Sequence, residues 1–283
     1  MRSSWRAVAA VGLTSTLLLF VPSSRPFAQD SMLRNIELCN GSDRNSAESQ
    51  IKGCTALINS GAPTSFGLAI AYNNRGNAYA NSAEYDRAIE DYDHSLELNP
   101  RYVRAYNNRG VAYEKKREFG RAIENYDAAT QLDSSYVIAV ANRAGAFTKK
   151  GEYERAVRDY DTVIKLQPSS KEGWRGRCWA HAQLGELNAA LKDCNEAIRL
   201  EPDSAVYDSR GFTYLRMNQL DLAIADYSAA LGMNPKLAPS LYGRGLAKLK
   251  KGDKGGGNRD LIAAKAVDSN IANEFKHYRI KGE

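Results

Sequence analysis

The chain has 283 residues, of which 43% are hydrophobic and 25% are charged, and this composition is too apolar for a generally disordered protein. The formal charge is +6, but the 39 basic residues are interspersed with 33 acids rather than clustered on one face. A nucleic-acid binder would need such a basic face, so we expect no nucleic-acid partner.

Residues 1–28 have the order of a secretory signal peptide. Arg2 and Arg6 precede an apolar run, which is followed by small residues up to Ala28. The run is shorter than the roughly 20 residues that span a bilayer, so a permanent membrane anchor is the less favoured alternative. We therefore expect cleavage near Ala28 and export, to the periplasm in the first instance and to the medium as the alternative.

The next part of the chain repeats itself. Three stretches that begin at residues 71, 105 and 139, and so lie 34 residues apart, align without a gap: AYNNRGNAYANSAEYDRAIEDYDHSLELNP, AYNNRGVAYEKKREFGRAIENYDAATQLDS and AVANRAGAFTKKGEYERAVRDYDTVIKLQP. A period of this length predicts a helix-turn-helix solenoid, in which no single unit can bury its apolar face alone.

The repeats resemble the tetratricopeptide-repeat pattern, which has a large residue at position 4, small residues at 8 and 27, aromatic residues at 11 and 24, Ala at 20 and Pro at 32. The first full repeat matches this pattern with Tyr72, Gly76, Tyr79, Ala88, Tyr92, Ser95 and Pro100. The resemblance implies an all-α, right-handed α-solenoid of antiparallel helix pairs. Its six units are expected near residues 69–102, 103–136, 137–170, 171–203, 204–237 and 238–271.

The two ends depart from the pattern, as expected for capping units. Residues 29–68 are expected to form an N-terminal segment and a capping helix, and Ser46–Ser60 reads as a lone second helix after an extended segment. In the sixth unit Gly257 stands where Ala is expected. Residues 272–283 are expected to form a covering helix, which starts near Ile271, and a tail.

Arginine recurs at position 7 of each repeat, and aspartate recurs at position 23 except in the second repeat, where Arg109 faces Asn125. These positions face each other across a hairpin that turns near position 15, so we expect a ladder of structural ion pairs, with anion binding as the alternative. The expected rungs are Arg75 with Asp91, Arg143 with Asp159, Arg177 with Asp193, Arg210 with Asp226 and Arg244 with Asp260.

The four cysteines suit an oxidising compartment. Cys178 and Cys194 occupy positions 8 and 24 of one hairpin, so a disulfide is expected there, with two buried thiols as the alternative. Cys39 and Cys54 are expected to pair and to tie the N-terminal segment to the capping helix. No catalytic or metal-binding motif is present, and His181 near Cys178 occupies a core position. We expect no enzymatic activity, no metal and no cofactor.

The inner surface of such a solenoid is the expected binding site. Asparagines line its N-terminal half and resemble the ladder with which some tetratricopeptide-repeat proteins hold a peptide backbone: Asn73, Asn74, Asn77, Asn107, Asn108 and Asn142. The alternative is that these side chains are merely solvated. Position 9 adds an apolar strip, Trp179, Phe212 and Leu246, which would contact a partner, the terminal helix folding back, or a second copy of the chain.

The sequence therefore predicts a non-catalytic scaffold that binds an unidentified protein or peptide in its concave groove. The alternative function is a structural scaffold that self-associates through the apolar strip, which would make the protein a homo-oligomer.

Overall fold

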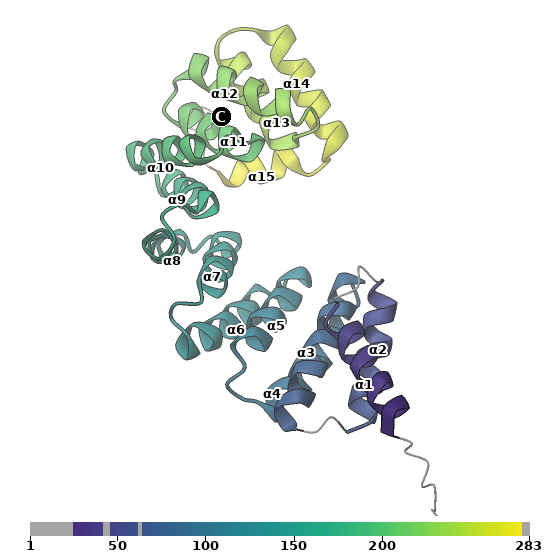
Figure 1. Ribbon diagram of the computed structural model, residues 1–283. Coiled ribbons are helices and arrows are strands. Elements are labelled where there is room, and N and C mark those ends of the chain that lie inside the picture. The colour runs from purple at the N-terminus through teal and green to yellow at the C-terminus, as the bar shows by residue number, and fades with distance from the viewer. Residues whose placement is uncertain (1–24, 42–45, 62–63, 279–283) are drawn as a thin grey trace, which may run out of the picture.

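The computed structural model describes residues 25–41, 46–61 and 64–278, and every regular element within these ranges is an α-helix (Figure 1). In chain order the helices are α1 Arg25–Cys39, α2 Ala47–Asn59, α3 Ser65–Asn81, α4 Tyr85–Leu98, α5 Val103–Lys115, α6 Phe119–Leu132, α7 Val137–Lys150, α8 Tyr153–Leu166, α9 Lys171–Leu184, α10 Leu187–Leu200, α11 Ser204–Arg216, α12 Leu220–Met233, α13 Ala238–Lys250, α14 Lys254–Val267 and α15 Ile271–His277. The predicted all-α solenoid is confirmed.

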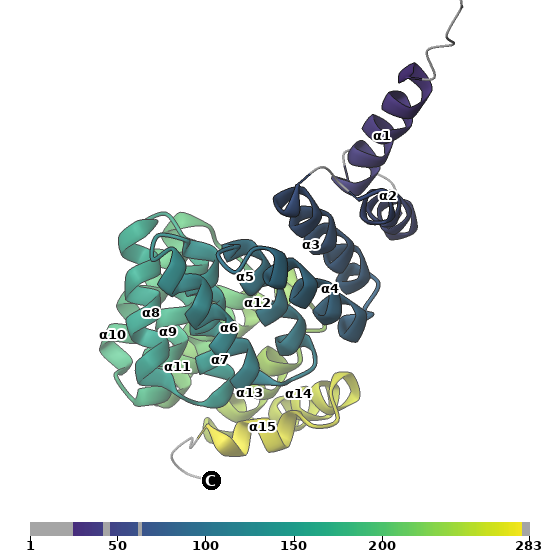
Figure 2. The same cartoon turned by 90° about the horizontal axis from the view of Figure 1, so that it is seen from below.

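The helices stack in one continuous series, in which each packs against the next. Odd-numbered helices from α1 to α13 also contact the next odd-numbered helix, whereas consecutive even-numbered helices make no such contact. The odd-numbered helices therefore approach one another more closely, and the stack curves with these helices on its inner side. Viewed from below, the chain winds until α13 to α15 lie on the same side of the molecule as α7 (Figure 2).

The turn inside each hairpin is set by one residue in the left-handed region. The backbone angle φ is positive at Ala83, Arg117, Gly151, Gly185, Asn218 and Gly252. The amide after each of them closes the turn on the end of the preceding helix; Glu84 N, for example, donates to Tyr79 O over 2.9 Å. This is the Schellman arrangement, which satisfies carbonyl groups that the helix leaves unpaired.

The core is made of alanines and aromatic rings that fit against small residues. Ala88, Ala122 and Ala156 are fully buried. A Cβ atom on Gly76 would lie only 2.8 Å from the ring of Tyr92, so this glycine sets how closely the two helices of the pair approach. The small residue at position 8 and the aromatic residue at position 24 of the repeat thus form one packing unit.

The N-terminal prediction requires a correction. Residues 25–39 form α1, which pairs with α2, so Ser46–Ser60 does not contain a lone helix and the segment before it is not extended. The reason is that Cys39 and its neighbours are buried against Cys54 and Leu57, which gives this segment an apolar partner. Most of the predicted signal peptide, residues 1–24, lies outside the described residues.

The C-terminal helix α15 contacts α13 and α14 and covers their ends. Ile271 is fully buried and Phe275 is 3% exposed, so this short helix is held by its apolar side chains. None of the helices in the described ranges is both long enough and apolar enough to cross a membrane.

Candidate functional site

The asparagines of the inner face bind one another. Each carboxamide nitrogen donates to the next carboxamide oxygen over 2.9–3.3 Å, in the order Asn142, Asn107, Asn108, Asn73, Asn74 and Asn40. This asparagine chain runs from α7 across α5 and α3 to the end of α1. Asn77 lies beside it and accepts hydrogen bonds from Asn108 and from the hydroxyl of Tyr92.

Two of the asparagines predicted to line the groove are not on the surface. Asn73 and Asn107 are only 3% and 4% exposed, because the position-5 side chain points between adjacent inner helices. Asn74, Asn108 and Asn142, at position 6, are half-buried and keep part of their surface. The asparagine chain is therefore a buried structural row with a partly exposed edge, rather than a fully solvated ladder.

The asparagine chain stops at the fourth repeat because position 6 there is Gly176. A Cβ atom at this glycine would lie 2.2 Å from the ring of Tyr160, which occupies the space of the missing side chain. Gly243 in the sixth repeat is related to Tyr227 in the same way, at 2.3 Å. In the C-terminal half, tyrosine rings thus replace the amide groups of the inner face.

The predicted apolar strip is not an open surface. Phe212 is 1% and Leu246 is 8% exposed, and Trp179 is half-buried. The cover is α15 with the residue after it: the ring of Tyr278 lies 5.3 Å from that of Trp179 and 5.4 Å from that of Phe212. Of the uses expected for the strip, contact with the terminal helix is the one found. A self-associating scaffold would need this same surface, which α15 already occupies.

A pocket of 320 Å³ remains between these side chains and the inner helices. Aromatic rings make much of its wall, and its three charged residues are Arg175, Asp208 and Glu274. The lining residues are Thr148, Arg175, Trp179, Ala205, Asp208, Ser209, Phe212, Tyr227, Leu237, Pro239, Glu274, Phe275 and Tyr278. We call this space the α15 pocket.

Asp208 is the central polar group of the α15 pocket. Burial raises the pKa of its carboxyl group to about 6, although the hydrogen bond from Ser240 and the nearby charge of Arg175 act in the opposite direction. The Ser240 hydroxyl donates to Asp208 Oδ1 over 2.5 Å. Tyr227 lies beneath it with a fully buried hydroxyl that has no hydrogen-bond partner among the described residues, and burial raises its pKa.

A larger depression of 760 Å³ adjoins the α15 pocket and shares Glu274 and Tyr278 with it. Its far wall comes from the α5–α6 turn and the end of α7, so it lies between the second repeat and the C-terminal helix. It is lined by Glu114, Lys115, Arg117, Phe119, Lys149, Asn270, Glu274 and Tyr278. The mainly charged depression and the aromatic α15 pocket are therefore neighbours that meet at α15.

The Arg–Asp ladder is a row of two-pronged contacts. Arg143, for example, donates through Nε and Nη2 to the two oxygens of Asp159, both over 2.7 Å. The same two-pronged contact occurs in the Arg75, Arg177, Arg210 and Arg244 rungs, with Asp91, Asp193, Asp226 and Asp260. Burial acts to raise the pKa of Asp260, but hydrogen bonds from Arg244 and Lys248 outweigh it and hold that pKa below its usual value.

Each arginine also reaches the preceding repeat, which the sequence reasoning missed. Arg143 Nη1 donates to Asp127 over 2.8 Å, and Arg177 Nη1 donates to Asp161 over 2.6 Å. Arg109 binds Asp93 in the same way. The recurring Tyr-Asp pairs at positions 24 and 25 were the available signal. One side chain thus ties its own hairpin and links it to the previous one.

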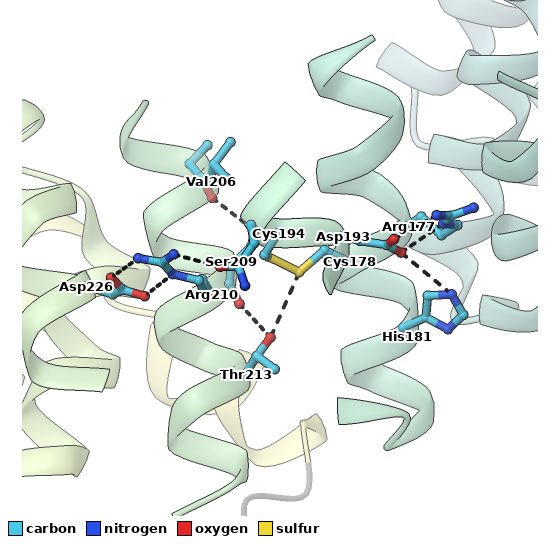
Figure 3. Close-up of a disulfide and its surroundings, with 12 residues drawn as sticks. Arg177, Cys178, His181, Asp193, Cys194, Val206, Ser209, Arg210, Thr213 and Asp226 are labelled. Atoms are coloured by element: carbon cyan, nitrogen blue, oxygen red, sulfur yellow. Dashed lines mark hydrogen bonds and ion pairs between the residues drawn. A yellow bond between two sulfur atoms is a disulfide. The ribbon is translucent and has the colours of Figure 1, made fainter. Parts of the chain in front are cut away.

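Both cysteine pairs lie at disulfide distance, with sulfur atoms 2.10 Å apart for Cys39–Cys54 and 1.98 Å apart for Cys178–Cys194. The second bridge stands directly beside the Arg177–Asp193 rung of the same hairpin (Figure 3). In this repeat a covalent bond therefore takes the place of the glycine–tyrosine contact of other repeats. Because the sulfur of Cys178 is in the bridge, no thiol is left beside His181.

The described residues contain no group of three or more His, Cys, Asp or Glu side chains that could hold a metal ion. The polar groups of the inner face are carboxamides, single carboxylates, hydroxyls and basic side chains. This arrangement can exchange hydrogen bonds with a bound molecule.

Solved structures with the same fold include a tetratricopeptide repeat protein from Parabacteroides merdae, with a TM-score of 0.71 and 18% identity over 88% of this chain and 99% of that chain. The Cut9–Hcn1 hetero-tetramer of APC/C gives a TM-score of 0.68 and 15% identity, over 88% of this chain and 48% of that chain. PilF of Pseudomonas aeruginosa gives a TM-score of 0.60 and 18% identity, over 74% of this chain and 96% of that chain. A search of curated protein sequences gave no match.

Family models described as tetratricopeptide repeat match residues 69–102, 103–136, 142–205 and 205–237. Together these segments cover more than half of the 283 residues, and they coincide with the helix pairs from α3 to α12. The chain therefore belongs to the tetratricopeptide-repeat family.

Proposed function

We propose that the protein is a non-catalytic scaffold that binds a polypeptide along its concave face. The observation that carries this proposal is the partly exposed edge of the asparagine chain, formed by Asn74, Asn108 and Asn142 on the inner helices α3, α5 and α7. A curved row of inner helices with free polar groups suits an extended segment.

Carboxamides suit this task because each has two donor hydrogens and two acceptor lone pairs. The links of the asparagine chain use only part of this capacity. The oxygen of Asn142, for instance, has no hydrogen-bond partner among the described residues, while its nitrogen donates to Asn107. Such groups can bind backbone amides and carbonyls without selecting a particular side chain.

The test begins with peptides selected from a random library on the purified chain. Peptides that bind in the groove should lose at least about tenfold in affinity, or about 1.4 kcal/mol, when Asn74 and Asn142 are both changed to Ala. Arg158→Ala on the outer helix α8 is the control, because Arg158 is exposed on the opposite side of the hairpin. Equal affinities of wild type and the double variant would contradict the proposal.

A further inference from the structure

We propose that the α15 pocket binds an organic cation, namely an ammonium or guanidinium group carried on an apolar stem. The pocket is a separate site from the asparagine chain, and the inference does not depend on the polypeptide-binding function proposed above.

The charges of the pocket favour a cation. Its lining contains two carboxylates, Asp208 and Glu274, and one guanidinium, Arg175, so the formal charge is −1. Arg175 makes no ion pair within 4.0 Å among the described residues, and neither does Asp208. The sole hydrogen bond to the Asp208 side chain in the described part of the protein comes from Ser240. A half-buried carboxylate with so few donors is stabilised by a positive charge.

The aromatic walls favour the same ligand. Trp179, Phe212, Phe275 and Tyr278 form one cluster, with ring centroids 4.8 Å apart for Trp179 and Phe212 and 5.4 Å apart for Phe275 and Tyr278. Faces of aromatic rings carry negative charge density and attract ammonium and guanidinium groups, most strongly when the site is desolvated. A pocket that combines a carboxylate with such rings is suited to a cation that has lost part of its water.

Size and polarity limit the rest of the ligand. A pocket of 320 Å³ is at the small end of ligand-binding cavities, so it admits one side chain or a small metabolite. Leu237, Pro239 and Ala205 supply apolar surface for an aliphatic stem. The net charge of −1 disfavours an anion in spite of Arg175, and a neutral apolar molecule would give Asp208 no direct charge partner, because Arg175 forms no ion pair with it.

Two sources offer this chemistry: a free diamine or guanidino compound, and a lysine or arginine side chain of a bound polypeptide. The mouth of the pocket shares Glu274 and Tyr278 with the neighbouring depression, so both could enter from the concave side.

The experiment is calorimetric titration of the purified full chain at neutral pH with cadaverine, agmatine, a blocked tripeptide with a central lysine, and glutarate as the anionic counterpart. We expect binding of the cations and none of glutarate. Asp208→Asn should weaken cation binding about tenfold or more, since a charged hydrogen-bond partner is lost. Asp221→Asn, at an exposed carboxylate on α12, should bind as wild type does.

Thermal unfolding of each variant checks that it folds. Glu274→Gln is the second test of charge, and because Glu274 is exposed at the rim it should fold normally and weaken binding less than Asp208→Asn. Similar affinities for cadaverine and the tripeptide would show that the site accepts both a free amine and a lysine side chain. Binding of the tripeptide alone would identify a polypeptide as the source of the cation. Binding of glutarate, no binding of any cation at millimolar concentration, or an Asp208→Asn variant with unchanged affinity would each overturn the proposal.

Discussion

The side chain at position 6 of each repeat decides what the inner face presents. Asparagine at this position in the first three repeats allows a row of amide hydrogen bonds to form. Gly176 and Gly243 leave room that the rings of Tyr160 and Tyr227 fill instead. A single residue type therefore separates the polar N-terminal half of the groove from its aromatic C-terminal half.

At the residue scale, the half-buried carboxyl group of Asp208 predicts an unusual pH dependence of the free energy of unfolding. Burial raises its folded pKa to about 6, whereas an unfolded aspartate titrates near 3.9, so the folded protein holds this proton more tightly. The ionised form therefore costs stability at neutral pH, and the cost disappears as the pH falls through about 6 toward about 4. The other titratable or charged groups that line the same pocket are Arg175, Tyr227, Glu274 and Tyr278.

The test is Asp208→Asn, which keeps the shape and removes the charge. Its free energy of unfolding should exceed that of wild type by about 1–2 kcal/mol at neutral pH, after allowance for partial solvent exposure, and the two should converge near pH 4. Urea denaturation at several pH values measures the difference. Asp221→Asn, which is exposed, provides the baseline. A gap that does not narrow with falling pH would contradict the assignment.

At the level of elements, the hairpin turns share one backbone conformation that the sequence indicates only in part. The turn inside each of the six helix pairs from α3–α4 to α13–α14 contains one residue with positive φ, yet only three of these residues are glycines. The others, Ala83, Arg117 and Asn218, adopt the conformation because the amide that follows closes the turn onto the previous helix. The left-handed conformation costs a non-glycine residue about 1 kcal/mol relative to glycine.

Ala83→Gly should therefore stabilise the protein by about 0.5–1 kcal/mol, and Gly185→Ala, at φ of 86°, should destabilise it by a similar amount. Thermal unfolding of the two variants measures both effects. Gly145→Ala is the matched control: this glycine lies inside α7, and a Cβ there would meet nothing within 4 Å, so the substitution should stabilise by up to about 1 kcal/mol. The turn geometry requires that Gly185→Ala lowers the free energy of unfolding and that Gly145→Ala does not.

The periodic elements could be predicted and the terminal ones only in part. A 34-residue period places the helices from α3 to α14 because each repeat carries the same pattern of small and aromatic residues. The pairing of α1 with α2 was missed because residues 25–39 lack this pattern and depend on contacts around Cys39 and Cys54. The sequence does not determine the position of α15 on Trp179 and Phe212, since it depends on contacts between residues 99 and 66 positions apart.

The same limit applies to the candidate site. The Arg–Asp contacts follow from hairpin geometry alone, which fixes positions 7 and 23 opposite each other. The bonds among asparagines do not, because the sequence does not indicate whether neighbouring carboxamides meet each other or solvent. The sequence reasoning also missed Asp208 as a residue of the inner face. The available signal was its position in the repeat, because it occupies position 5, as Asn73 and Asn107 do in the first two repeats.

At the scale of the whole molecule, the arginine ladder links each repeat to the preceding one. Arg143→Met should remove the partner of Asp159, which is buried, and the link to Asp127 in the preceding repeat. We expect a loss of about 2–3 kcal/mol in the free energy of unfolding by urea. Arg199→Met, which breaks an exposed pair with Glu196, should cost less than about 0.5 kcal/mol. Equal losses would mean that the ladder contributes no more than a surface pair.

The asparagine chain also gives the groove a direction. The three links that join different helices all donate toward the N-terminus. The two ends of the chain therefore differ: Asn142 only donates to its neighbour, and Asn40 accepts from Asn74. Reversing one carboxamide would set oxygen against oxygen at its neighbour, so the row keeps a single polarity as a unit. If a polypeptide strand binds along this row as proposed, its parallel and antiparallel orientations would differ in energy before any of its side chains makes contact.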